Sequence, residues 1–200
     1  GNGIEASKFS NEQAPISSTK FIMISRLLRD KGVLEFLQAA KSVVNKYHDR
    51  NCKFILYGDI DDANFNSLSL TDIQPYLTSN ITYAGFNSDI QTCIKNSSVV
   101  VLPSYREGFS KVLMEAQASA RPVITSNVTG CKDAILNGST GFLVEPMNAN
   151  DLQEKIEFFI LNSDLVFDMG QAAYEHAVNN FTIQKAIDEH IEMFSAILSD

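Results

Sequence analysis

The fold is decided by residues 20–47, which read KFIMISRLLRDKGVLEFLQAAKSVVNKY. The run at 21–24 is short, apolar and rich in β-forming side chains, so it predicts a buried strand. From Asp30 to Tyr47, apolar side chains recur every three or four residues, which predicts an amphipathic helix. A buried strand followed by a helix is the repeating unit of an α/β protein.

The same alternation continues as far as residue 144. Further strands are expected at 54–57, 81–83, 99–102, 122–124 and 141–144. Helices are expected between them, in a segment ending near 77 and at 89–95, 111–120 and 132–136. Because a parallel connection needs a crossover helix, the pattern predicts an α/β fold with a Rossmann-like, doubly wound parallel sheet of about six strands.

The two ends of the chain differ from this central pattern. Beyond residue 150 the periodicity is helical throughout, which predicts a C-terminal helical cap with helices over 152–160, 164–178 and 183–198. The first residues are polar and irregular. The expected organisation is a lead-in or hinge at 1–19, a ligand-binding domain at 20–180 and a C-terminal helix at 181–200.

Composition sets the broad class of the protein. The 200 residues are 44% hydrophobic and 20% charged, which is enough for a packed core and excludes disorder as the main state. Lys and Arg number 16 against 24 Asp and Glu, so the formal net charge is −8. This charge disfavours a bulk electrostatic grip on nucleic acid or anionic lipid, and we expect no nucleic-acid partner.

Cysteine, histidine and hydropathy patterns narrow the class further. Cys52, Cys93 and Cys131 are odd in number and widely spaced, which predicts reduced thiols rather than disulfides or zinc ligands. The three histidines are far apart, so we expect none of them to be a metal ligand, and we expect no cofactor. The sequence lacks a secretion signal and an apolar run of the ~18 residues that a membrane span needs, which predicts a cytoplasmic protein.

Clustered charge follows the first predicted strand. Ligands of such sheets bind outside the carboxyl ends of the strands, near the point where the strand order reverses. Arg26 stands at the end of the strand and Lys31 at the start of the helix, so both side chains can point at one site. A guanidinium and an ammonium together suit a diphosphate. The alternative is a set of solvated charges around Asp30.

A second charged loop follows the fourth predicted strand. Gly108 permits close approach of a ligand to the backbone, and a helix beginning near Ser110 would present unpaired N–H groups to an anion. Glu107 precedes this helix and Glu115 lies on its second turn, where carboxylates can accept hydrogen bonds from vicinal hydroxyls. The alternative is that Glu107 only complements the helix dipole and Glu115 is a surface residue.

The glycines form none of the common nucleotide or hydrolase signatures. The sequence contains no GxGxxG fingerprint, no Walker A sequence and no GxSxG elbow. These absences count against dinucleotide dehydrogenases, P-loop NTPases and serine hydrolases.

The two charged loops resemble a known family. SRL at 25–27 with KG at 31–32, and EGFS at 107–110 with EA at 115–116, are similar to the donor-binding C-terminal half of retaining glycosyltransferases of the GT-B fold, family 4. Glu107 and Glu115 match the Glu-x7-Glu motif of that group. The resemblance covers the chain to about residue 181. It departs from the family pattern at 58–60, where many relatives carry a second glycine.

The resemblance implies a role for each matching residue. Arg26 and Lys31 would hold the diphosphate of a UDP- or GDP-linked sugar and stabilise the charge that develops on it. Glu107 would bind hydroxyls of the donor sugar, and Glu115 those of the ribose. The implied donor-binding set is Arg26, Lys31, Tyr83, Gly85, Phe86, Glu107, Gly108, Phe109, Ser110 and Glu115, with Arg26, Lys31 and Glu107 in catalytic roles and without a metal.

The resemblance also implies a reaction and an acceptor. Segments 57–77 and 131–135 look most like bacterial enzymes that extend polyprenyl-diphosphate-linked glycans for surface polysaccharides. The expected reaction transfers a hexosyl or N-acetylhexosaminyl group to a glycan acceptor, bound by an N-terminal domain without which this chain would be inactive. The full-length enzyme would contact the membrane only peripherally. The alternatives are a nucleotide-sugar epimerase of related fold and a non-catalytic nucleotide-sugar-binding module.

Overall fold

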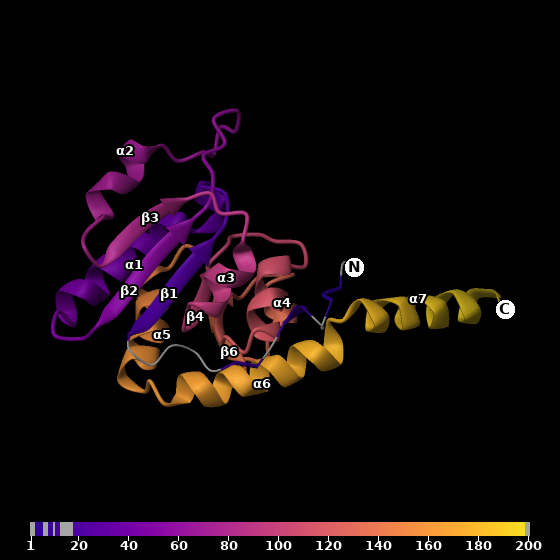
Figure 1. Ribbon diagram of the computed structural model, residues 1–200. Coiled ribbons are helices and arrows are strands. Elements are labelled where there is room, and N and C mark those ends of the chain that lie inside the picture. The colour runs from indigo at the N-terminus through magenta and orange to yellow at the C-terminus, as the bar shows by residue number, and fades with distance from the viewer. Residues whose placement is uncertain (1–2, 6–7, 10, 13–17, 199–200) are drawn as a thin grey trace.

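A computed structural model describes residues 3–5, 8–9, 11–12 and 18–198. Its centre is one sheet of six strands in the order β3-β2-β1-β4-β5-β6 (Figure 1). The strands are β1 (Thr19–Ile24), β2 (Cys52–Tyr57), β3 (Ile81–Gly85), β4 (Val99–Leu102), β5 (Val123–Ser126) and β6 (Gly141–Val144). Every pairing in this sheet is parallel, which confirms the predicted doubly wound α/β fold.

Helices cover both faces of the sheet (Figure 1). They are α1 (Val33–Lys46), α2 (Leu70–Ile73), α3 (Ile90–Lys95), α4 (Lys111–Ala118), α5 (Ala149–Leu161), α6 (Leu165–Asn180) and α7 (Ile183–Leu198), with short 3-10 helices η2 (Arg29–Lys31), η3 (Gln74–Tyr76) and η4 (Lys132–Ala134). Across the sheet, β2 lies on one side of β1 and β5 lies on the opposite side of β4. Because both crossovers are right-handed, α1 and α4 lie on opposite faces of the sheet. Helix α5 packs on α1 and α6 packs on α4, while α7 extends away from the body.

Three helix predictions need correction. The helix expected at 132–136 is only the 3-10 turn η4, because Ile135 is already extended. The helix expected from residue 30 begins at Val33, because Gly32 adopts φ +76° and separates it from the 3-10 turn η2. The helix expected to reach residue 120 ends at Ala118, and Ala120 has a left-handed φ of +53°. None of the helices in the described part of the chain is long and apolar enough to cross a membrane.

The main core lies between the sheet and its helices. The central strands are buried, and the Phe21 and Phe54 rings stack at 5.1 Å between centroids, with the edge of Phe36 from α1 against Phe54. Each buried aromatic side chain contributes about 2–3 kcal/mol of transfer free energy. This packing fixes the strands, and therefore the loops that leave their carboxyl ends.

A second, smaller core joins the beginning of the chain to α4 and α6. Ile4 is buried with Met114 of α4 and with Phe181, the first of two residues between α6 and α7. The Ile4 amide donates to the Phe181 carbonyl at 2.7 Å, and the Ile183 amide donates to the Ile4 carbonyl at 3.0 Å. Part of the predicted lead-in thus belongs to the folded body, while its residues 1–2, 6–7, 10 and 13–17 lie outside the described residues.

Candidate functional site

The sheet has its switch point between β1 and β4, which are neighbours in the sheet although β2 and β3 lie between them in the sequence. The loops that leave their carboxyl ends, residues 25–32 and 103–110, therefore meet above the same edge. They enclose a hollow of about 270 Å³, lined by Ile24, Ser25, Arg26, Lys31, Leu102, Glu107, Gly108, Phe109, Ser110, Lys111 and Val112. The structure thus brings together Arg26, Lys31 and residues 107–110 of the predicted site.

An ion pair joins the two loops at the hollow. The Lys31 ammonium lies 2.7 Å from Glu107 Oε1, and the two side chains are only 20% and 16% exposed. At this burial the pair is screened less than a surface salt bridge. The sequence placed both residues in one site and did not predict their contact.

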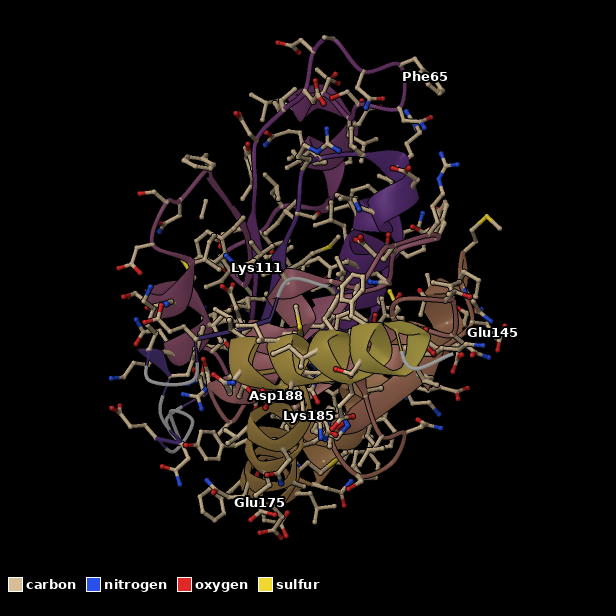
Figure 2. The ribbon with its side chains drawn as sticks, turned by 90° about the vertical axis from the view of Figure 1, so that its right-hand side faces the viewer. Phe65, Lys111, Glu145, Glu175, Lys185 and Asp188 are labelled. Carbon is tan, nitrogen blue, oxygen red and sulfur yellow. The ribbon has the colours of Figure 1, made fainter. Side chains whose placement is uncertain are left out.

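Arg26 is more exposed and is paired with a residue that the sequence analysis did not single out. Its Nη1 donates to Asp61 Oδ2 at 2.8 Å, and the Arg26 side chain is 59% exposed. Asp61 belongs to the loop between β2 and α2, which projects from the body and carries Phe65 at its outer end (Figures 1 and 2). A guanidinium has five N–H donors, so one ion pair leaves capacity for phosphate oxygens.

Helix α4 points its N-terminus at the hollow. Ser110 is its N-cap as predicted, and the Ser110 side chain makes no capping hydrogen bond. The amides of the first turn have no partner inside the helix and carry partial positive charge. At Gly108 an added Cβ would meet nothing within 4 Å, so the loop before the helix is open on that side. This end of α4 therefore suits an anion.

The loop after β4 rests on a glycine that the sequence analysis did not single out as functional. Gly130 has φ +84°, and a Cβ there would lie 2.1 Å from the carbonyl oxygen of Gly108 and 2.5 Å from that of Glu107. A larger residue would push the loop that carries Glu107. The sequence signal at Gly130 is its place, with Ala134 and Ile135, in a segment that resembles the corresponding segment of GT-B glycosyltransferases.

Glu115 opens onto a second hollow beside the first. This hollow of about 540 Å³ is lined by Ser88, Asp89, Ile90, Gln91, Lys111, Val112 and Glu115. Lys111 and Val112 line both hollows. In the view of Figure 2, Lys111 lies well away from the projecting loop that carries Phe65. The Glu115 side chain is 12% exposed and lies 3.5 Å from the Lys111 ammonium. The two carboxylates of the Glu-x7-Glu motif therefore face adjoining spaces.

In the described part of the chain, the predicted residues at the end of β3 line neither of these two hollows. The Tyr83 hydroxyl donates to the Gly58 carbonyl at 3.0 Å, and the Gly85 carbonyl accepts from the Gly58 amide at 3.0 Å. Phe86 is 71% exposed. Tyr83 and Gly85 thus hold the β2 and β3 ends together, and contact of this loop with a base stays a prediction.

The thiols are not available for chemistry at the site. Cys52, Cys93 and Cys131 are free and buried. Burial raises the pKa of the Cys131 thiol, and the nearby Glu107 carboxylate raises it further, so this thiol stays protonated at neutral pH. Within the described ranges, no group of three or more His, Cys, Asp and Glu side chains is placed to hold a metal ion. The absence of a metal requirement stays a prediction.

The fold and the site together define a class of protein. It is an α/β domain with a doubly wound sheet, whose switch point carries two cations, two carboxylates and a helix N-terminus, groups whose chemistry suits a phosphorylated, hydroxyl-bearing ligand. Comparison with known proteins makes this class specific, because residues 6–176 match the family model described as Glycosyl transferases group 1. The chain belongs to this family, and the resemblance to GT-B glycosyltransferases is confirmed.

Individual relatives agree with this membership. The chain is 32% identical to the capsular polysaccharide biosynthesis glycosyltransferase CapM of Staphylococcus aureus. The alignment covers all of this chain and 54% of CapM. A second relative is the N,N'-diacetylbacillosaminyl-diphospho-undecaprenol alpha-1,3-N-acetylgalactosaminyltransferase of Campylobacter jejuni. The sequence identity is 32%, over an alignment that covers 78% of this chain and 39% of that protein. The chain thus spans about half the length of these relatives or less.

A solved structure extends the comparison to a nucleotide complex. The structure of a mutant of S. aureus TarM with fondaparinux, alpha-GlcNAc-glycerol and UDP superposes with a TM-score of 0.77 and 25% identity, over 92% of this chain and 38% of that one. The relatives are glycosyltransferases of bacterial capsule and undecaprenyl-linked glycan synthesis, and a related fold carries UDP.

Proposed function

We propose that this chain binds a nucleotide-diphospho-sugar, UDP- or GDP-linked, across the two adjoining hollows. The observation that carries the proposal is the Lys31–Glu107 ion pair at the switch point, beside the N-terminus of α4. The pair offers a cation for phosphate and a carboxylate for sugar hydroxyls within one small space.

Each predicted residue has a place in this proposal. Arg26 and Lys31 hold the diphosphate, and Glu107 with the amides of 108–110 holds the donor sugar. Glu115, in the second hollow, accepts hydrogen bonds from the ribose hydroxyls. The loop that contains Tyr83, Gly85 and Phe86 flanks the base. The support for this assignment is the order of the lining residues, which runs from the end of β1 through α4 to the hollow beside α3.

The same residues can lower the barrier to sugar transfer. When the bond between sugar and diphosphate breaks, about one additional negative charge develops on the leaving oxygen. A cation about 4 Å away stabilises a unit charge by ~4 kcal/mol at an effective dielectric constant of 20. Arg26, Lys31 and the N-terminal end of α4 line the same hollow, so they can stabilise this charge where it develops. Glu107, by holding sugar hydroxyls, positions the reacting carbon.

The whole protein's reaction is a wider proposal. We propose a retaining transferase that passes a hexosyl or N-acetylhexosaminyl group to a glycan acceptor carried on polyprenyl diphosphate. The name of the C. jejuni relative, which acts on an undecaprenol-linked acceptor, supports this class. In this proposal the full-length enzyme works in the cytoplasm and contacts the membrane peripherally, and residues 1–200 bind donor without turnover.

A ligand panel tests the proposal directly. Thermal unfolding is measured with UDP-glucose, UDP-N-acetylglucosamine, GDP-mannose and ADP-glucose, each with and without EDTA. A donor at 100 times its Kd should add about 2.7 kcal/mol to the stability of the folded state. One nucleotide sugar should raise the midpoint, and EDTA should leave that shift unchanged. If none of the four shifts the midpoint at millimolar concentration, the proposed function is wrong.

A further inference from the structure

The segment that follows β4 is clamped to the segment that leads into α1. The Tyr105 amide donates to the Asp30 carbonyl at 2.8 Å, and the Ser104 hydroxyl lies 3.0 Å from the same oxygen. Gly32 allows the closest approach, since a Cβ there would lie 2.1 Å from the Pro103 carbonyl oxygen. The two loops of the site therefore meet through their backbones as well as through side chains.

A tyrosine-carboxylate hydrogen bond lies next to the ion pair. The Tyr105 hydroxyl donates to Glu35 Oε1 at 2.6 Å, a charge-assisted bond. Glu35 follows Lys31 by four residues, and Tyr105 precedes Glu107 by two. Three side-chain links thus connect the same pair of segments: Tyr105 to Glu35, Glu107 to Lys31, and the exposed Arg106 to Asp30, with 3.5 Å between Arg106 Nη2 and Asp30 Oδ2.

The three links differ in rigidity, and the Arg106–Asp30 pair is the most exposed of them, with the Arg106 side chain 78% exposed. Lys31 and Glu107 have long, flexible side chains, and Glu107 lies outside regular secondary structure, next to the unhindered Gly108. Tyr105 has only two side-chain torsions and is held at both ends, through its amide and through its hydroxyl. Burial and the bond to Glu35 raise the pKa of the Tyr105 hydroxyl, which therefore remains a donor at neutral pH. Tyr105 is the rigid member of the clamp.

We propose that Tyr105, held by Glu35, is a positioning residue that sets where Glu107 meets Lys31 and thereby governs recognition of the donor sugar rather than of the nucleotide. This inference rests on the proposed function, in which Glu107 holds sugar hydroxyls. Tyr105 itself lies outside the residues that line the 270 Å³ hollow, so within the described chain its effect passes through Glu107.

Tyr105→Phe tests the proposal, because it keeps the ring and removes only the hydroxyl. The matched control is Tyr47→Phe, which removes a hydrogen bond of 3.1 Å to Glu157 at the other end of α1. Calorimetry measures affinity for the best nucleotide sugar of the panel and for its nucleoside diphosphate alone. Tyr105→Phe should weaken nucleotide-sugar binding about fivefold, equal to ~1 kcal/mol, and diphosphate binding less than about twofold. The control should change neither, and equal loss for both ligands overturns the proposal.

Two further measurements decide whether Tyr105 acts through Glu107. In a Glu107→Gln background, Tyr105→Phe should raise the Kd for the nucleotide sugar by less than about 1.5-fold, since the effects of interacting residues are not additive. A further rise of about fivefold contradicts the proposal. Without ligand, amides of 107–110 should exchange hydrogen faster in Tyr105→Phe and not in Tyr47→Phe. Unchanged exchange overturns the positioning role even if no donor binds, whereas failure of wild type to bind any donor counts against the proposed function alone.

Discussion

Lys31→Ala is the substitution that bears most directly on the site. The Lys31 ammonium lies 2.7 Å from Glu107 Oε1 in a pair that is mostly buried. Full Coulomb attraction to a phosphate charge about 4 Å away would be ~4 kcal/mol, and partial exposure reduces the expected loss to about 2–3 kcal/mol. The substitution also leaves the Glu107 carboxylate unpaired beside the diphosphate. We expect the Kd for the nucleotide sugar to rise about 30- to 150-fold.

Calorimetry on the 200-residue chain measures this loss, and circular dichroism verifies that the variant folds. Lys46→Ala is the matched control, because the Lys46 ammonium also pairs with a glutamate, at 2.6 Å from Glu157 Oε2, and lies at the far end of α1. The control should alter the Kd less than about twofold. A Kd for Lys31→Ala within about threefold of wild type, with an unchanged unfolding midpoint, would refute a phosphate role for Lys31.

Three further predictions concern other parts of the molecule. Glu115→Gln should weaken binding of the nucleotide about tenfold by calorimetry, because a neutral amide oxygen accepts weaker hydrogen bonds than a carboxylate, by ~1 kcal/mol or more in total; unchanged affinity removes Glu115 from the site. Gly130→Ala should lower the free energy of unfolding in urea by about 1–3 kcal/mol more than Gly138→Ala. Both glycines have positive φ, but only at Gly130 would a Cβ strike the Gly108 carbonyl. Burial lowers the pKa of His176, so the unfolded state binds the proton first, and stability should fall as pH drops below about 6.5. Urea unfolding at two pH values on either side of that point should reveal this loss in wild type, and a smaller loss in His176→Gln.

The fold was predictable because its signals are local. The apolar strand at 21–24 and the helical spacing after Gly32 carry their own secondary structure, and the crossover rule then leaves few arrangements of a parallel sheet. Helix boundaries were less predictable, since a left-handed residue such as Gly32 ends one turn and starts another without a change in hydropathy.

The site was predictable as a set of residues and not as a set of contacts. Arg26, Lys31 and Glu107 stand in loops that follow strands, and topology alone brings such loops together. Their partners depend on side-chain packing between distant segments. Asp61 is one of several acidic residues in a polar loop, and nothing in the sequence distinguishes it as the partner of Arg26. The Tyr105–Glu35 bond joins residues seventy positions apart and has no sequence signal.

The backbone contact between Ile4 and the segment joining α6 to α7 has a mechanical consequence. Two backbone hydrogen bonds tie the beginning of the chain to the point where α7 departs. Any domain joined ahead of residue 3 would therefore be attached to the body of the protein where α7 begins. A rotation of that domain would act on this attachment point. Phe181 lies at this attachment point. Its ring packs in a T-shaped arrangement with the Phe109 ring, with 5.2 Å between the ring centroids. This pair of rings links the point where such a domain would be attached to the loop that carries Glu107.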